Sequence, residues 1–123
     1  MVPIKPRISV EYVDKATIVT FTDEKILEEK DLQALQESIM SVIESAAGGI
    51  NMILDFQNVQ FLSSAVLGLL IRISKKVYEQ DGQLKLCGIA PKIYRIFKIT
   101  RLTKIFDIYQ DVNSAVESLT AAD

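Results

Sequence analysis

The chain has 123 residues and a formal net charge of −2; 49% of its residues are hydrophobic and 24% are charged. This length fits one domain that can bury a full core without a disulfide or a metal staple, and the slightly negative charge argues against nucleic acid as a partner, because phosphate contacts need a basic surface. The chain contains no histidine, which excludes a Ser-His-Asp hydrolase and a typical zinc site within it. No metal site and no cofactor are expected.

The first elements expected along the chain are two strands. Residues 1–7 contain two prolines and predict a loose lead-in, so the domain itself should span residues 8–120. The segments Ile8–Val13 and Ala16–Phe21 are rich in alternating, β-branched and aromatic residues, which favour strands. Because only a short polar turn at residues 14–15 separates them, an antiparallel hairpin is predicted.

A loop and a helix should follow the hairpin. The polar, acidic residues 22–30 indicate a loop that leads into a helix, with Ile26 and Leu27 tucking back onto the core. Residues 31–47 repeat apolar side chains with a period of about 3.6, which predicts an amphipathic helix. The glycine pair at residues 48–49 should end that helix.

The centre of the chain reads as a buried strand followed by a second helix. Residues 50–56 are mostly apolar and should form a central strand that ends near Asp55. Ser63 or Ser64 opens the next helix, which should run to about Gln80. The remaining expected elements are a strand at residues 84–87, a helix at 92–99 with Pro91 at its first turn, a strand at 105–109 and a helix at 112–119 capped by Asp111.

The order of these elements, β-β-α-β-α-β-α-β-α, predicts an α/β fold. Strands that alternate with helices imply parallel neighbours and right-handed crossovers. The N-terminal hairpin makes the β-sheet mixed, and about four helices should cover it.

The serine pair Ser63-Ser64 lies after a central strand, where α/β proteins usually place their sites. Serine is a favoured N-cap, which stabilises a helix by about 1 kcal/mol relative to alanine. A helix start also stabilises negative charge, so a phosphate on Ser64 would leave the fold intact and add close to two negative charges to an exposed edge. The chain has no phosphate-binding loop or dinucleotide fingerprint, so a partner kinase would have to supply such a phosphate.

Three segments carry a family resemblance. They are Leu54-Asp55 followed by Phe61-Leu62-Ser63-Ser64-Ala65-Val66-Leu67-Gly68, then Lys85-Leu86-Cys87-Gly88-Ile89-Ala90-Pro91, and last Arg101-Leu102 with Ile105-Phe106. The first resembles the signature Asp-Ser-(Ser/Thr)-Gly-Leu-Gly of the STAS domain of bacterial anti-sigma factor antagonists. The resemblance runs from about Ile8 to Leu119 and implies a single STAS-type domain.

The resemblance also implies a function without catalysis by this chain. Such antagonists act in a partner-switching cascade: the unphosphorylated form binds an anti-sigma factor serine kinase, and phosphorylation of a serine releases it. That serine maps to Ser64. Two positions depart from the signature, with Ser63 in place of the aspartate and Val66 in place of a glycine, so phosphorylation at Ser63 or at neither serine stays open. Gly68 is kept, and a helix residue without a Cβ would allow close backbone approach.

The partner surface expected from the resemblance surrounds the serine pair and includes the loop after the second strand. Leu62 and Val66 are expected to be its exposed apolar anchors. The partner-binding residues expected in total are Asp23, Glu24, Leu62, Ser63, Ser64, Ala65, Val66 and Gly68.

Three other functions compete with the antagonist. One is an unphosphorylated STAS scaffold subunit of a stressosome-like assembly, and another is the STAS subunit of a lipid or other transporter complex. The third, an enzyme with a carboxylate site, lacks a histidine, a phosphate loop or a metal motif to support it. A homodimer is also left open.

Basic residues recur at every third position near the C-terminal end: Lys92, Arg95, Lys98, Arg101 and Lys104. They read as a solvated helix face or as a basic edge that meets an acidic partner. The apolar residues between them are expected mostly in the core: Ile93, Ile96, Phe97 and Ile99.

Two further residues and the hydropathy pattern complete the interpretation. The lone Cys87 should be a buried, inert thiol in a reducing compartment, and Asp55 should end the central strand and accept loop N–H groups. No apolar run is long enough for a membrane span, and the N-terminus lacks the apolar core of a signal peptide. A cytoplasmic protein with no membrane partner is therefore expected.

Overall fold

The structure, a computed structural model, describes residues 8–13, 15–46 and 49–121. The lead-in expected at residues 1–7 lies outside the described residues. The same is true of Asp14, in the expected turn, and of Gly48, at the expected helix end.

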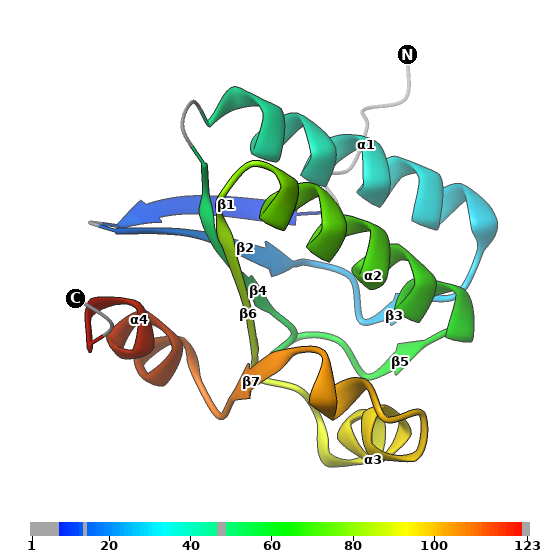
Figure 1. The fold of residues 1–123 in the computed structure, drawn as a ribbon. Coiled ribbons are helices and arrows are strands. Elements are labelled where there is room, and N and C mark those ends of the chain that lie inside the picture. The colour runs from blue at the N-terminus through cyan, green and yellow to red at the C-terminus, as the bar shows by residue number, and fades with distance from the viewer. Residues whose placement is uncertain (1–7, 14, 47–48, 122–123) are drawn as a thin grey trace.

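A mixed sheet organises the described part of the chain (Figure 1). Its strands, in spatial order, are β1 (Ile8–Val13), β2 (Ala16–Phe21), β4 (Asn51–Asp55), β6 (Gln83–Cys87) and β7 (Asp107–Tyr109). β1 and β2 pair antiparallel as the predicted hairpin, whereas β2, β4, β6 and β7 are parallel neighbours. β4 is central and buried, as its largely apolar sequence predicts.

Helices cover both faces and one end of this sheet (Figure 1). They are α1 (Glu29–Ser45), α2 (Ser64–Glu79), α3 (Pro91–Ile99) and α4 (Val112–Ala121), with a 3₁₀ turn η1 (Leu102–Lys104). α1 and α2 pack against each other on one face, and α4 packs on the other. α3 lies at the end of the sheet where the parallel strands finish, which is also where α2 begins.

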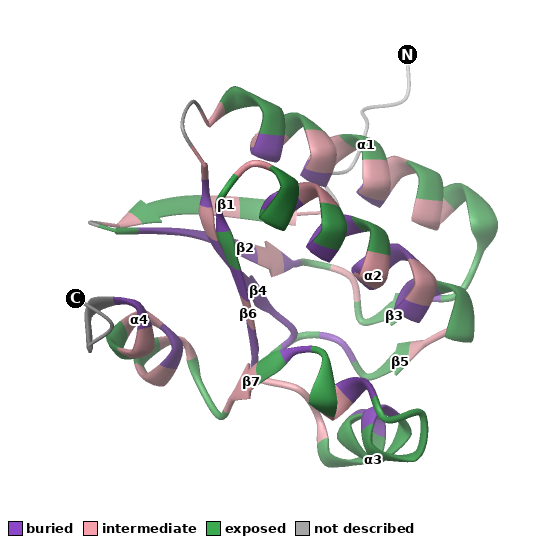
Figure 2. Cartoon of the chain, in the orientation of Figure 1, coloured by how far each residue is buried: buried purple, intermediate pink, exposed green. Residues whose placement is uncertain are grey.

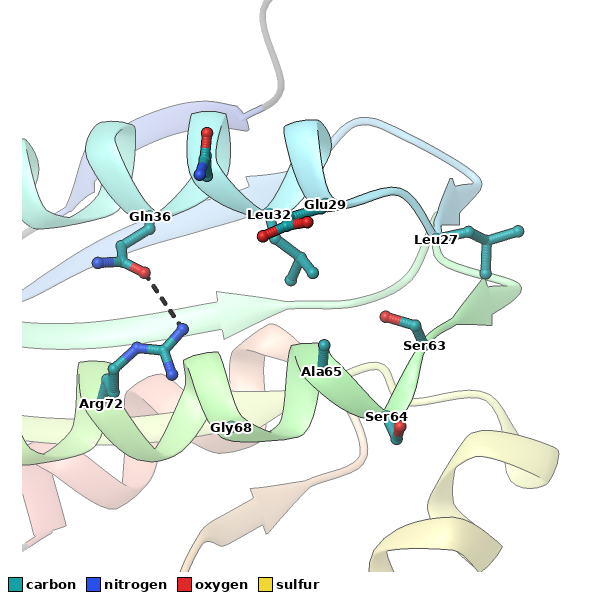
Figure 3. Close-up of a pocket in the computed structure, with 10 residues that line it drawn as sticks. Leu27, Glu29, Leu32, Gln36, Ser63, Ser64, Ala65, Gly68 and Arg72 are labelled. Atoms are coloured by element: carbon teal, nitrogen blue, oxygen red, sulfur yellow. Dashed lines mark hydrogen bonds between the residues drawn. The ribbon is translucent and has the colours of Figure 1, made fainter.

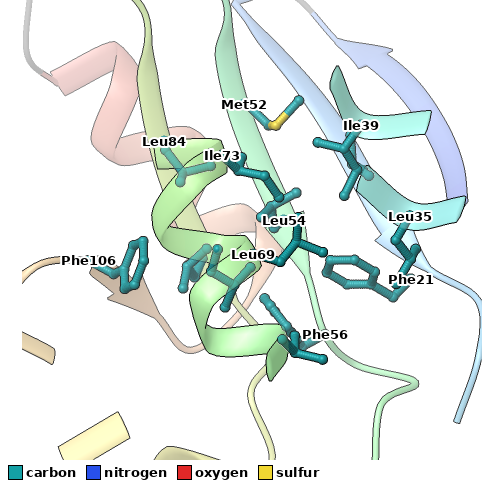
Figure 4. Packing of buried hydrophobic residues seen from close by; sticks show 14 of the residues in the cluster. Phe21, Leu35, Ile39, Met52, Leu54, Phe56, Leu69, Ile73, Leu84 and Phe106 are labelled. Carbon is teal, nitrogen blue, oxygen red and sulfur yellow. The ribbon is translucent and has the colours of Figure 1, made fainter. Parts of the chain in front are cut away.

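The main core lies between the sheet and the pair α1–α2 (Figures 2 and 4). Phe21 of β2 and Phe56, just after β4, stack with ring centroids 4.7 Å apart. Leu35 from α1 and Leu69 from α2 are 1% exposed and close this layer from above. A smaller cluster under α4 includes Ala115 against the opposite face of the sheet.

The helix expected at residues 31–47 is α1, Glu29–Ser45, so both predicted boundaries are wrong by two residues. Glu28 is the N-cap residue with extended backbone, and its carbonyl accepts the N–H groups of Asp31 and Leu32 at 3.0 and 3.2 Å. Acidic residues in a first turn complement the positive end of the helix dipole. The acidic stretch therefore continues into the helix instead of forming only a loop.

The strand expected at residues 105–109 is shorter, Asp107–Tyr109. The amides of Ile105 and Phe106 donate to the carbonyl of Leu102 at 3.0 Å each, so η1 takes up their hydrogen bonds. The described chain also contains two short strands that periodicity does not predict, β3 (Lys25–Ile26) and β5 (Phe61–Leu62). These two pair with each other in parallel and form a second small sheet beside the start of α2.

Candidate functional site

The start of α2 is held by the loop that follows β2. The amides of Gln60 and Phe61 donate to the carbonyl of Glu24 at 2.8 and 3.1 Å, and the amide of Ser63 donates to the carbonyl of Ile26 at 3.0 Å. These bonds continue the β3–β5 pairing and fix the backbone up to the residue before α2. The loop after β2 therefore lies beside the serine pair, where the family resemblance places it.

Ser63 occupies the N-cap position of α2, with φ −84° and ψ 161°, but its side chain does not cap the helix. Its Oγ is buried and has no hydrogen-bond partner among the described residues. Only the backbone carbonyl of Ser63 acts, accepting the amide of Val66 at 3.0 Å. The expectation that a serine hydroxyl caps this helix is therefore wrong.

Ser64 is the first residue of α2 and is exposed. Figure 3 shows its hydroxyl pointing away from α1, whereas the hydroxyl of Ser63 points toward α1. The two neighbouring serines thus differ in access, and an incoming reagent can reach Ser64.

A groove of about 630 Å³ separates the first turns of α1 and α2 (Figure 3). Leu27, Leu32 and Ala65 give it an apolar lining beside the serine pair. Its far end is closed by a hydrogen bond of 3.2 Å from Arg72 Nη2 to Gln36 Oε1. The groove is open to solvent and borders the exposed serine.

Gly68 lines this groove and has no contact that requires a glycine. A Cβ built there would meet only Arg72 Nη1, at an ordinary 3.7 Å. Close backbone approach within the molecule is therefore not the reason for a glycine at this position. Its missing side chain instead leaves the groove open.

Val66 is 1% exposed and belongs to the core, so its expected role as an exposed anchor of a partner surface is wrong. Leu62 is half-buried. The surface beside Ser64 instead presents Leu27, Phe61 and Ile96, which are 50%, 44% and 39% exposed. The predictions that Leu27 tucks back onto the core and that Ile96 lies in it are therefore wrong.

These exposed side chains line a second cleft, of about 240 Å³, together with Leu62 and Lys92. The ammonium nitrogen of Lys92 lies 3.8 Å from the centroid of the Phe61 ring. Sequence reasoning missed this cleft, because it assigned two of the residues that line it, Leu27 and Ile96, to the core. The available signal was the spacing of Lys92 and Ile96, which puts them on one helix face.

The two acidic residues expected at the partner surface, Asp23 and Glu24, lie outside the groove at Ser64. Glu24 is exposed beside β5, and Asp23 is half-buried, but neither lines the groove at Ser64. Glu29 does line it, at the start of α1. Among the described residues, no group of three acidic, cysteine or histidine side chains could hold a metal ion.

Asp55 and Cys87 form a buried pair at the carboxyl ends of β4 and β6. Asp55 is 3% exposed and accepts the amide of Gln57 at 3.0 Å, which confirms its predicted place at the strand end. Burial raises the pKa of Asp55, while hydrogen bonds from Gln57 and Cys87 oppose that shift. Burial and the charge of Asp55 raise the pKa of Cys87 to about 12, so the thiol is protonated and inert, as predicted.

The sequence and the fold of the chain are both similar to those of known proteins. The profile of the STAS domain family matches residues 8–115. Among curated relatives, the anti-sigma F factor antagonist of Paenibacillus polymyxa is 29% identical over 68 residues, which cover 54% of this chain and 58% of that protein. The anti-sigma-B factor antagonist of Bacillus subtilis is 31% identical over 74 residues, which cover 60% and 65%. The matched parts span less than two thirds of these relatives.

A solved structure shows the same fold. The anti-sigma-factor antagonist (STAS) domain protein from Planctomyces limnophilus superposes with a TM-score of 0.82 over 92% of this chain and 97% of that one, at 19% identity. Within the described residues, no helix is both long enough and apolar enough to cross a bilayer.

Proposed function

Since the chain belongs to the STAS domain family, we propose that it is an anti-sigma factor antagonist that works by partner switching. The names of its curated relatives support this role. In its unphosphorylated form the protein binds an anti-sigma factor serine kinase through the surface around the start of α2. Binding occupies the kinase and frees the sigma factor, and the antagonist itself catalyses nothing.

Phosphorylation of Ser64 ends the interaction. The Ser64 Oγ attacks the γ-phosphorus of ATP on the kinase, the bond from that phosphorus to the β–γ bridging oxygen breaks, ADP leaves, and a kinase base takes the hydroxyl proton. The phosphate then lies at the N-terminus of α2, where free N–H groups and the helix dipole favour it. It changes the docking surface without disturbing the core.

The observation that carries this proposal is the difference in access between the two serines. Ser64 is exposed with its hydroxyl pointing away from α1, whereas the Ser63 Oγ is buried. A kinase needs an accessible hydroxyl, so Ser64 is the better acceptor although Ser63 replaces the family aspartate beside it.

A pull-down from native extract tests the proposal, comparing the unmodified protein with Ser64→Glu and with Ser63→Ala as matched control. We expect a serine kinase to be held by the unmodified protein and by Ser63→Ala, and to be lost with Ser64→Glu. With ATP present, that kinase should phosphorylate the unmodified protein but not Ser64→Ala. A kinase held equally by Ser64→Glu would contradict the switch.

The replacement of the family aspartate by Ser63 keeps a second role under test, that of an unphosphorylated STAS scaffold or transporter subunit. Equal capture of other STAS proteins or of membrane transport components by the unmodified and Ser64→Glu proteins would favour it.

The antagonist role also places the protein in the cytoplasm. Its partners under that role act in transcription, and its single cysteine suits a reducing compartment.

A further inference from the structure

One face of α3 carries both cations and uncovered isoleucines. Lys92, Arg95, Ile96 and Ile99 follow the spacing of a single helix face, while Ile93 and Phe97 supply the buried face with 2% and 0% exposure. Ile99 is 75% exposed, which makes it the most exposed large apolar side chain among the described residues. The prediction that Ile99 lies in the core is therefore wrong, and Figure 2 shows how much of α3 is exposed.

This face continues into the surface beside the serine pair. Ile96 lines the same cleft as Leu27 and Phe61, and Ile99 lies one turn farther along α3. We call Leu27, Phe61, Ile96 and Ile99 the apolar strip. Adjacent large apolar side chains left uncovered on one surface are typical of sites that bind a partner.

The charge at the α3 end of the strip is positive. The ammonium nitrogens of Lys92 and Lys25 lie 3.8 and 5.6 Å from the centroid of the Phe61 ring. No acidic residue occurs between residues 88 and 106, although the whole chain is acidic. At the Leu27 end of the strip, Glu24 and Glu29 are exposed acids, while Glu28 pairs with Lys30 at 3.3 Å. The complementary surface therefore combines apolar side chains with carboxylates.

We propose that the apolar strip docks an acidic edge of the partner kinase, with an apolar kinase side chain in the cleft and kinase carboxylates on Lys25 and Lys92. A protein is the occupant because the cleft is concave and of side-chain size, about 240 Å³, whereas a bilayer surface is flat. The inference rests on the proposed function for the identity of the partner. It extends the docking surface from the start of α2 to the end of α3.

The position of Ser64 beside the apolar strip explains how a phosphate on Ser64 would release the bound kinase. Leu62 lines the cleft, and Ser64 follows two residues later with its hydroxyl on the side away from α1. A phosphate on Ser64 therefore stands at the rim of the strip. There it competes with the kinase carboxylates for Lys92 and repels them.

The test uses the purified kinase captured by the unmodified protein, with the dissociation constant measured by calorimetry. Ile99→Ser and Lys92→Glu remove one apolar anchor and one cation from an exposed face, so the fold should persist. We expect each to weaken binding about tenfold or more. Tyr78→Ser and Lys75→Glu are matched controls on exposed positions of α2 remote from its start, and they should change binding less than about twofold.

The outcomes separate the two proposals. If the kinase binds the unmodified protein, Ile99→Ser and Lys92→Glu with the same affinity, the strip proposal is overturned while the antagonist function stands. If no kinase binds the unmodified protein, both fail. If Ile99→Ser abolishes binding to phosphatidylglycerol vesicles and leaves kinase binding unchanged, the strip is a membrane surface and the proposal is overturned.

Discussion

Within the described parts of the chain, the hydroxyl of Ser63 is buried without a hydrogen-bond partner, whereas the neighbouring Ser64 is exposed. The turn of the backbone from β5 into α2 produces this difference. The amide of Ser63 donates a hydrogen bond of 3.0 Å to the carbonyl of Ile26, whereas Ser64 is the first residue of the helix. The Ser63 hydroxyl therefore faces the protein interior, whereas Ser64 is accessible to solvent.

Replacing Ser63 by alanine should not destabilise the protein. Loss of a working serine N-cap costs about 1 kcal/mol, but the Ser63 Oγ makes no such bond and is buried without compensation. We expect the unfolding free energy of Ser63→Ala to be unchanged or raised by up to about 1 kcal/mol. Urea denaturation measures it, and a fall of about 1 kcal/mol or more would show a cap that forms in solution.

Asp111 provides the matched control for this experiment. Its Oδ1 accepts the amide of Ser114 at 2.8 Å, so Asp111 caps α4 as predicted. The same denaturation experiment should show that Asp111→Ala lowers the unfolding free energy, unlike Ser63→Ala.

Asp55 should make stability depend on pH in the direction opposite to most carboxylates. Burial raises its folded pKa above the ordinary 3.8. As the pH rises through 3.8 and then through the folded pKa, the unfolded state loses this proton first, so the Asp55 contribution to stability falls. Across that window, Asp55→Asn should gain stability relative to the wild type. Paired urea titrations at several pH values measure this difference, and a difference that does not vary with pH would refute it.

Cys87 should resist thiol reagents in the folded protein. Its pKa of about 12 keeps it protonated at pH 8, and the side chain is buried. We expect reaction with a chromogenic disulfide reagent only at the rate of unfolding, and rapid reaction in urea. A fast reaction of the native protein would mean that the end of β6 opens locally.

Gly88 should not tolerate alanine. Its φ of +67° is rarely adopted by other residues, and a Cβ there would lie 2.7 Å from Asp55 Oδ1 and 3.2 Å from the amide nitrogen of Gln57. Strain and the displaced carboxylate together should lower the unfolding free energy of Gly88→Ala by about 2 kcal/mol or more. Chemical denaturation checks this, and a loss below about 0.5 kcal/mol would contradict the local geometry.

The sequence predicts the large elements well because each carries a long periodic or continuous apolar pattern. β4 and α2 are of this kind, as is the position of Ser64 at a helix start. β3 and β5 have two residues each and therefore no period to detect; only their pairing reveals them. The apolar strip was missed for a related reason. Periodicity identifies the apolar residues on a helix face, but which of them are buried depends on neighbours distant in the sequence. The rings of Phe97 and Phe106 pack with their centroids 6.3 Å apart, whereas Ile99 is exposed to solvent.

Gly68 offers the sharpest separation of folding from binding. It lies inside α2 with only an ordinary contact to Arg72 for an added Cβ, so Gly68→Ala should raise the unfolding free energy by about 1 kcal/mol. Gly68→Leu should fold as well, but its side chain would fill the groove beside Ser64 and weaken kinase binding about tenfold. Ser41→Leu, exposed on α1 and outside that groove, is the matched control and should bind normally. Denaturation and calorimetry on the same samples measure both effects. Normal kinase binding by Gly68→Leu would restrict the docking surface to the Ser64 edge and the α3 side, because a filled groove would then be irrelevant to the partner.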